Sequence, residues 1–158
     1  WSCRGFQTKT EPGLPGSLGP HKRPRLTPCP SLVMKDGEPV MVLGGYGGDH
    51  IPQGTLQVFL NMVEFGFDPQ EAVEAPRFYS YSFPNSQYPS AYNPGLLRAE
   101  QRIGADVLEG LRARGHSVEA HPDWWEGACL YGAITRNPEN GVLQGGADPR
   151  GEAYAVGY

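Results

Sequence analysis

Two glycine pairs interrupt an apolar run between residues 42 and 51, which reads VLGGYGGDHI. Glycine lets the backbone turn sharply and brings bare N–H groups close to a ligand. A segment with helical patterning begins near Gln53, and the start of a helix adds partial positive charge. The stretch therefore predicts a loop that binds an anion, which is a phosphate, a carboxylate or the oxyanion of an acyl-transfer intermediate. A plain structural turn is the alternative.

Two polar residues follow the second glycine pair directly, Asp49 and His50. An aspartate at this place either contributes to a ligand site or caps the helix that follows. His50 is the histidine that lies beside the loop, so we take it as a candidate substrate-binding residue, with an ordinary structural role as the alternative. No two of the four histidines have metal-ligand spacing, so we expect no metal site. The four are His21, His50, His116 and His121.

Composition limits the classes of partner. The net charge is −4, and the one basic run, residues 21–25, is short. A protein that follows nucleic-acid phosphates needs clustered Lys and Arg, so nucleic acid is not an expected partner. The chain has 22 glycines, 16 prolines and only 19% charged residues among 158. This turn-rich composition fits a half-domain packed against another chain, and it equally fits one loop-rich domain. No apolar run reaches the length of a membrane span.

Three cysteines, Cys3, Cys29 and Cys129, cannot all pair within the chain, and their spacing matches no zinc or redox motif. We interpret them as free thiols of a reducing or cysteine-tolerant compartment. This favours the cytoplasm slightly over the periplasm or secretion. An export signal on a separate part of the protein would leave the localisation open.

A β-hairpin is predicted to lead into the glycine loop. Residues 31–35 and 39–43 are β-prone, and Asp36-Gly37 between them is typical of a two-residue turn with positive φ. Two helices are predicted to follow. The first spans residues 53–65, with a core-facing stripe at helical spacing and Gly66 as its stop; the stripe is Leu56, Phe59, Leu60 and Val63. The second runs from a capping box at Asp68-Pro69-Gln70-Glu71 to about Ala75.

The second half of the chain is predicted to alternate loop, helix and strand. Residues 78–97 are rich in Tyr, Ser, Asn and Pro, and such aromatic loops line a pocket, cover a neighbour or simply pack on the surface. A third helix is expected at 104–114. Strands are expected at 116–120 and 130–135, the latter turned back into residues 142–143 by Asn140-Gly141. This order predicts a layered α+β fold.

Several blocks of the sequence resemble the small subunit of the gamma-glutamyltranspeptidase family. Their order and spacing agree over most of the chain from Lys22 onward. The blocks are KRP at 22–24, PSLVMKDG at 30–37, the glycine loop, LQ at 56–57, the stretch from FG at 65–66 to APRF at 75–78, ADPR at 147–150 and VGY at 156–158.

The resemblance implies an N-terminal-nucleophile hydrolase. Such a protein is a four-layer αββα sandwich, here completed by another chain. It cuts its own precursor and exposes a threonine whose amine acts as the base. The threonine is expected outside this chain, on the large subunit or the remainder of the precursor. Residues 1–28 are then an irregular arm that packs on this partner, and residues 29–158 are the C-terminal portion of the catalytic domain.

The resemblance also implies roles for residues near the loop. Gly47 and Gly48 fall on the glycine pair that forms the oxyanion hole. Thr27 aligns with a serine pair that helps transpeptidases bind the glutamyl α-carboxylate. Asp49 stands where those enzymes often carry serine, and its charge would oppose a bound carboxylate. The Asp148-Pro149-Arg150 block is interpreted as a structural tie rather than a catalytic group.

These features together predict part of an amidohydrolase that cleaves an amide bond of a small molecule without a cofactor. A gamma-glutamyl transferase or glutathione hydrolase is the first alternative. A binding module that retains the fold without catalysis is the second, and a phosphate-binding module is a weaker third. The departures at Thr27 and Asp49 favour the amidohydrolase branch of the family over a true transpeptidase.

Overall fold

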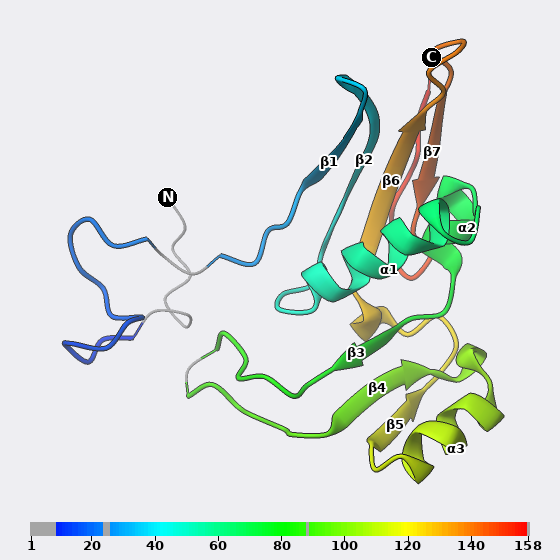
Figure 1. The fold of residues 1–158 in the computed structure, drawn as a ribbon. Coiled ribbons are helices and arrows are strands. Elements are labelled where there is room, and N and C mark those ends of the chain that lie inside the picture. Colours follow the sequence, from blue (N-terminus) through cyan, green and yellow to red (C-terminus); the bar gives the residue numbers. More distant parts are fainter. Residues whose placement is uncertain (1–8, 24–25, 88, 158) are drawn as a thin grey trace.

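The computed structural model describes residues 9–23, 26–87 and 89–157. Among the described residues, helices and strands begin at Ser31 (Figure 1). In chain order they are β1 (Ser31–Lys35), β2 (Glu38–Tyr46), α1 (Ile51–Val63), α2 (Pro69–Glu74), β3 (Phe78–Ser80), β4 (Leu96–Glu100), η2 (Gln101–Ile103), α3 (Ala105–Ala113), β5 (Ser117–His121), η3 (Glu126–Ala128), β6 (Leu130–Arg136) and β7 (Leu143–Ala147).

The larger sheet has the strand order β1-β2-β6-β7, with every neighbouring pair antiparallel. Helices α1 and α2 lie against one face of this sheet (Figure 1). The main hydrophobic core fills the space between the sheet and these helices because alternate side chains of β2 and β6 point toward them. Its buried members are Met41, Leu43, Ile51, Val58, Met62, Ala72, Val73, Cys129, Tyr131 and Ala133.

The opposite face of the larger sheet exposes apolar side chains in this chain. Leu32, Met34, Val42 and Ile134 are each about half exposed or more. An αββα sandwich requires a second sheet against such a face. This exposed face is where a second sheet from another chain would pack. That packing stays a prediction.

A smaller sheet has the order β3-β4-β5, with β4 and β5 parallel and α3 in the connection between them. The sequence prediction missed β3 and β4, because it assigned the whole of residues 78–97 to a loop. The ends of that segment are strands and only its middle is a loop. Strand β3 is only three residues long, and β4 pairs with residues about twenty positions away, so local periodicity carries little of the signal.

Several local predictions are confirmed. Asp36 and Gly37 both have positive φ, 52° and 84°, as the predicted hairpin turn needs. Asp68 and Glu71 form the reciprocal capping box of α2. Gly141 has a φ of 74° in the turn that leads into β7, and Cys29 and Cys129 are free thiols. Cys3 lies outside the described residues.

The bounds of two elements differ from the prediction. Strand β2 continues through Gly44 and Gly45, which were predicted to belong to the loop. These glycines pair with Gly132 and Tyr131, and a Cβ at Gly45 would overlap the carbonyl oxygen of Leu130. Gly45 therefore allows close strand packing, and only the second glycine pair forms the turn. Helix α1 begins at Ile51, two residues earlier than predicted.

The predicted buried face of α1 was wrong in part: Phe59 packs against the core, but Leu56 and Val63 do not. Leu56 is 56% exposed and Val63 is 46% exposed. Ile51, Val58 and Met62 point into the core instead. Both stripes have helical spacing because α1 carries apolar residues on most of its surface, so spacing alone could not choose between them.

The described part of residues 1–28, namely 9–23 and 26–28, has turns and an isolated bridge between Lys9 and Ser17, without helix or ladder. An arm that packs on a partner stays a prediction. None of the helices in the described part of the chain is long and apolar enough to cross a bilayer.

Candidate functional site

Gly47 and Gly48 form the turn between the end of β2 and the start of α1. Their φ angles are 144° and 91°, in the region that favours glycine. A Cβ at Gly47 would also overlap the Sγ of Cys129, whereas a Cβ at Gly48 would meet open space. Gly47 is therefore required both by its backbone and by its neighbour, and Gly48 by its backbone alone.

The amides of this turn are available to a ligand. The Gly48 carbonyl accepts a hydrogen bond from Ile51 N at 3.3 Å, which closes the turn onto α1. Among the described residues, neither the Gly47 nor the Gly48 N–H donates to another group. Two open donors beside a helix start can stabilise an anion or a developing oxyanion.

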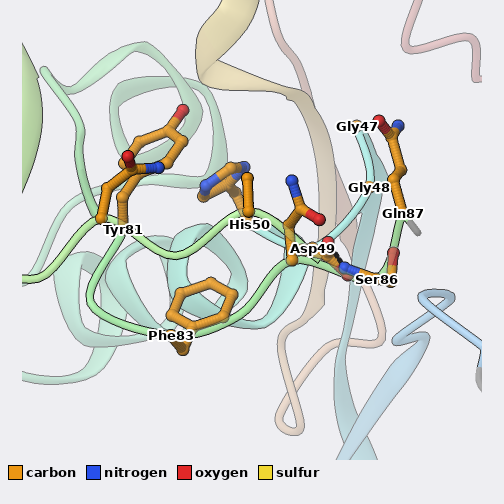
Figure 2. A pocket seen from close by; sticks show the side chains of 11 residues that line it. Gly47, Gly48, Asp49, His50, Tyr81, Phe83, Ser86 and Gln87 are labelled. Carbon is orange, nitrogen blue, oxygen red and sulfur yellow. Dashed lines mark hydrogen bonds between the residues drawn. The ribbon is translucent and has the colours of Figure 1, made fainter. Parts of the chain in front are cut away.

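A hollow of about 280 Å³ lies beside this turn. One wall is the turn itself with Asp49 and His50, and the other wall is the loop between β3 and β4 (Figure 2). The second wall consists of Tyr81, Phe83, Asn85, Ser86, Gln87, Ala91 and Asn93. The tyrosine-rich segment thus lines a pocket, one of the roles that its composition allowed, although the sequence did not indicate which residues would do so.

Asp49 joins the two walls of the hollow. Its Oδ2 accepts a hydrogen bond of 2.6 Å from Ser86 N, which comes from the loop 37 residues later (Figure 2). The N-cap of α1 is His50, and that residue makes no side-chain capping bond. The alternative interpretation of Asp49 as the helix cap is therefore wrong, because its carboxylate is used to hold the loop.

His50 lies among aromatic rings. Its imidazole is 4.4 Å from the ring of Tyr81 and 5.2 Å from that of Tyr79, centroid to centroid, with Phe83 at 6.1 Å. Burial lowers the pKa of His50, although the nearby Asp49 acts in the opposite direction. Its Nε2 is buried without a hydrogen-bond partner among the described residues. A neutral imidazole therefore contributes to this wall at neutral pH.

The structure brings four of the five predicted site residues together. Gly47, Gly48, Asp49 and His50 all line the hollow, but Thr27 does not. Thr27 is 7% exposed and precedes β1 in the chain. No group of three His, Cys, Asp or Glu side chains within the described ranges has a geometry that could hold a metal ion.

A second polar centre, the charge cluster, consists of Arg77, Glu100, Arg102, Asp148 and Arg150. Arg150 donates to both carboxylates: its Nε is 2.6 Å from Glu100 Oε1 and its Nη1 is 2.9 Å from Asp148 Oδ1. Arg77 pairs with the other oxygen of Asp148. This agrees with the interpretation of Asp148-Pro149-Arg150 as a structural tie, because these charges bind one another and nearby backbone.

Tyr131 connects the charge cluster to the glycine turn. Its backbone N–H donates to Asp148 Oδ2 at 3.1 Å, and the Arg77 guanidinium lies 4.7 Å from its ring centroid. Its hydroxyl is 3.3 Å from the carbonyl oxygen of His50 and 3.2 Å from that of Ile51. The side chain thus fixes the start of α1, next to Gly47 and Gly48.

Comparison with known proteins assigns the chain to a family. The family model described as gamma-glutamyltranspeptidase matches residues 4–158. The chain belongs to this family. It is 34% identical over 141 residues to the glutathione hydrolase-like YwrD proenzyme of Bacillus subtilis, covering 89% of this chain and 26% of that protein. It is 33% identical over 158 residues to the oxamate amidohydrolase proenzyme of Klebsiella pneumoniae, covering 100% and 29% respectively.

A solved structure gives the same assignment. The chain superposes on cephalosporin acylase from Bacillus halodurans with a TM-score of 0.78 and 31% identity, over 93% of this chain and 25% of that one. The fold is therefore the α+β fold of this group of N-terminal-nucleophile hydrolases, as the resemblance implied. The chain spans less than a third of the length of these relatives.

Proposed function

We propose that this chain is part of an autoprocessed amidohydrolase and supplies its oxyanion hole. The observation that carries the proposal is the turn at Gly47 and Gly48, where two positive-φ glycines present open amides beside the start of α1. Membership of the gamma-glutamyltranspeptidase family supports it, because the relatives described above are proenzymes named as hydrolases of glutathione and oxamate.

The proposed reaction uses a threonine nucleophile on a polypeptide outside this chain. The hydroxyl oxygen attacks the amide carbonyl, and its proton passes to the threonine's own amine. The amides of Gly47 and Gly48 stabilise the resulting oxyanion. The C–N bond then breaks, the leaving amine takes the proton, and an acyl ester remains. Water attacks this ester and releases the acid together with the free hydroxyl.

The residues around the turn shape the acyl site in this proposal. Asp49 and His50 form one wall of the hollow, and Thr27 stays a candidate for substrate binding from outside it. A gamma-glutamyl transferase or glutathione hydrolase activity is the alternative. The carboxylate of Asp49 disfavours that alternative, because a glutamyl group brings its own α-carboxylate to the site.

A substitution at Gly48 tests the role of the turn. The protein is assembled with the polypeptide that carries the nucleophile, and intact-mass measurement with N-terminal sequencing confirms a chain that begins with threonine. Gly48→Ala strains the turn and displaces its amide. We expect kcat on an amide substrate to fall by about a hundredfold, because a shift of about 1 Å in a catalytic group has that effect.

The matched control is Gly66→Ala. Gly66 also has a positive φ, 73°, and open space at its Cβ position, but it follows the far end of α1. Both substitutions carry similar backbone strain, and only Gly48→Ala is expected to reduce kcat. Equal kcat values for both variants would contradict the oxyanion role. An assembled wild-type protein that hydrolyses no amide would favour the non-catalytic binding module instead.

A further inference from the structure

Among the described residues that line the hollow, Asp49 is the one with a formal charge at neutral pH, because the lowered pKa of His50 keeps that imidazole neutral. The guanidinium of Arg98 lies 4.5 Å from the ring centroid of Tyr81, but it is paired with Glu119. The rest of the lining is aromatic, amide or hydroxyl in character, with Phe83, Asn85, Gln87 and Asn93 as examples. A single carboxylate in such surroundings repels a second negative charge and favours hydrogen-bond donors.

Asp49 cannot readily move its charge away from the hollow. The hydrogen bond from Ser86 N fixes its Oδ2 at 2.6 Å, and Ser86 is itself buried. The residue is also held at its own backbone, between Gly48 and the N-cap of α1. Its charge is therefore a constant feature of the wall rather than one conformer of a mobile side chain.

The glycine turn that would bind the oxyanion also lines the hollow. Gly47 and Gly48 line it together with Asp49 (Figure 2). A substrate whose carbonyl oxygen lies on these amides would extend its acyl chain along Asp49 and the loop between β3 and β4. A volume of about 280 Å³ suits a short acyl chain, since pockets for drug-sized ligands have volumes of roughly 300–1,000 Å³.

We propose that this hollow is the acyl subsite and that Asp49 makes it select uncharged, hydrogen-bonding acyl groups over acyl groups that carry a carboxylate. The inference rests on the proposed amidohydrolase function and specifies its substrate class. Asp49 acts here as a specificity residue, and its bond to Ser86 separately positions the loop between β3 and β4.

An isosteric pair of substrates tests the selectivity in the assembled protein. Glutaryl-p-nitroanilide carries a terminal carboxylate, and 4-carbamoylbutanoyl-p-nitroanilide carries a neutral amide of nearly the same shape. We expect kcat/KM to be at least about tenfold higher for the neutral substrate, the size of effect that one nearby like charge produces. Equal values, or a preference for the glutaryl substrate, would overturn the inference.

Variants at Asp49 separate its charge from its hydrogen bond. Asp49→Asn removes the charge and keeps a side-chain oxygen that accepts from Ser86 N, so the preference should shrink by about tenfold while the neutral substrate is still hydrolysed. Asp49→Ala removes both features, so hydrolysis of the neutral substrate should fall as well. An unchanged preference in Asp49→Asn would overturn the role of the charge.

Two further changes sharpen the test. Glu64→Gln makes the same change of charge at the opposite end of α1, and it should leave the preference unchanged. Gln87 is an exposed residue of the hollow, so Gln87→Lys is expected to weaken the preference for the neutral substrate and Gln87→Glu to strengthen it. The absence of this order would contradict an electrostatic origin of the selectivity.

A binding measurement distinguishes failure of this inference from failure of the proposed function. Calorimetric titration of the assembled protein with glutaramate and with glutarate needs no turnover, and the two compounds share one carboxylate and differ only at the other end. Tighter binding of glutaramate, with the difference lost in Asp49→Asn, would support the subsite even if no amide were hydrolysed. Tighter binding of glutarate would reject the inference even if the protein proved to be an amidohydrolase.

Discussion

The hollow at Gly47–Asp49 and the charge cluster around Arg150 differ in how many of their polar groups have hydrogen-bond partners. In the charge cluster each of the four carboxylate oxygens of Glu100 and Asp148 accepts at least two hydrogen bonds from protein donors. In the hollow the amides of Gly47 and Gly48 have no described partner. Gly47 is exposed and Gly48 is partly exposed, so these unpaired donors are accessible to a ligand.

The difference separates residues that hold the fold from residues that do chemistry. The charge cluster joins α2, β4 and the segment after β7, elements that are far apart in the chain. Its two carboxylates are satisfied by protein donors, although the Nε atoms of Arg77 and Arg102 have no partner among the described residues. The hollow has a rigid backbone and one fixed charge, and it gains partners only when something binds. Substitutions in the two regions should therefore affect different measurements.

Arg150→Met should have the largest effect of these substitutions, and this effect should be a loss of folding stability. Arg150 is 3% exposed and binds Glu100, Asp148 and the carbonyl oxygens of residues 73–75. Its loss leaves two buried carboxylates without their main cation, which costs about 3–5 kcal/mol. The urea midpoint of the assembled protein should fall accordingly. Arg112→Met, which removes a solvent-exposed pair with Glu109, should change the free energy of unfolding by about 1 kcal/mol or less.

If the two arginine variants unfold at similar urea concentrations, the charge cluster does not hold the fold and the comparison fails. Replacing a whole buried ion cluster by apolar residues can be nearly neutral, so the single substitution is the informative one.

Acid should destabilise the folded protein through the charge cluster. Burial alone would raise the pKa of Glu100, but the hydrogen bonds and charge of Arg150 overcome this and lower the pKa below its ordinary value of 4.5. A carboxyl group with a lowered pKa stabilises the folded state above its unfolded pKa. That contribution is lost as the pH falls from about 4.5 through the folded value, by at most about 1.4 kcal/mol per pH unit for one proton.

Glu100→Gln tests this assignment. The variant should be less stable than the wild type at pH 7, because a neutral amide replaces a paired carboxylate. Its free energy of unfolding should then vary less steeply with pH below 4.5. Urea midpoints at pH 7, 5 and 4 measure both effects, and parallel curves for the two proteins would show that another group causes the loss in acid.

The sequence predicted the parts of the fold that depend on local chemistry. Asp36-Gly37 requires positive φ, and Asp68 with Glu71 caps a helix, so these elements were found correctly. Strand β4 and the charge cluster depend on residues 20 to 77 positions apart. Local periodicity contains no information about such partners, and this explains why β3 and β4 were missed.

Only part of the candidate site was predicted from the sequence. The glycine turn was found because a positive φ at Gly47 and Gly48 is a local requirement that glycine meets. The function of Asp49 was uncertain because its partner, Ser86, lies in a loop whose position the sequence does not reveal. The buried face of α1 was predicted only in part for the related reason that two apolar stripes share the same spacing and only tertiary packing selects one.

Tyr131→Phe should have the smallest effect and tests whether the two regions are coupled. The hydroxyl contacts the carbonyl oxygens of His50 and Ile51, and burial raises the pKa of Tyr131, so it remains a protonated donor. Its removal should cost about 0.5–1.5 kcal/mol of stability. Because the start of α1 would be held less firmly beside Gly48, kcat should also fall, by less than in Gly48→Ala.

Asp68→Ala is the matched control for Tyr131→Phe. It removes the side-chain cap of α2, which costs about 1 kcal/mol without contact with the glycine turn. Both variants should therefore have similar urea midpoints, and kcat should fall only in Tyr131→Phe. If kcat is the same in both, the charge cluster and the hollow are independent, and Tyr131 contributes only to the stability of the core.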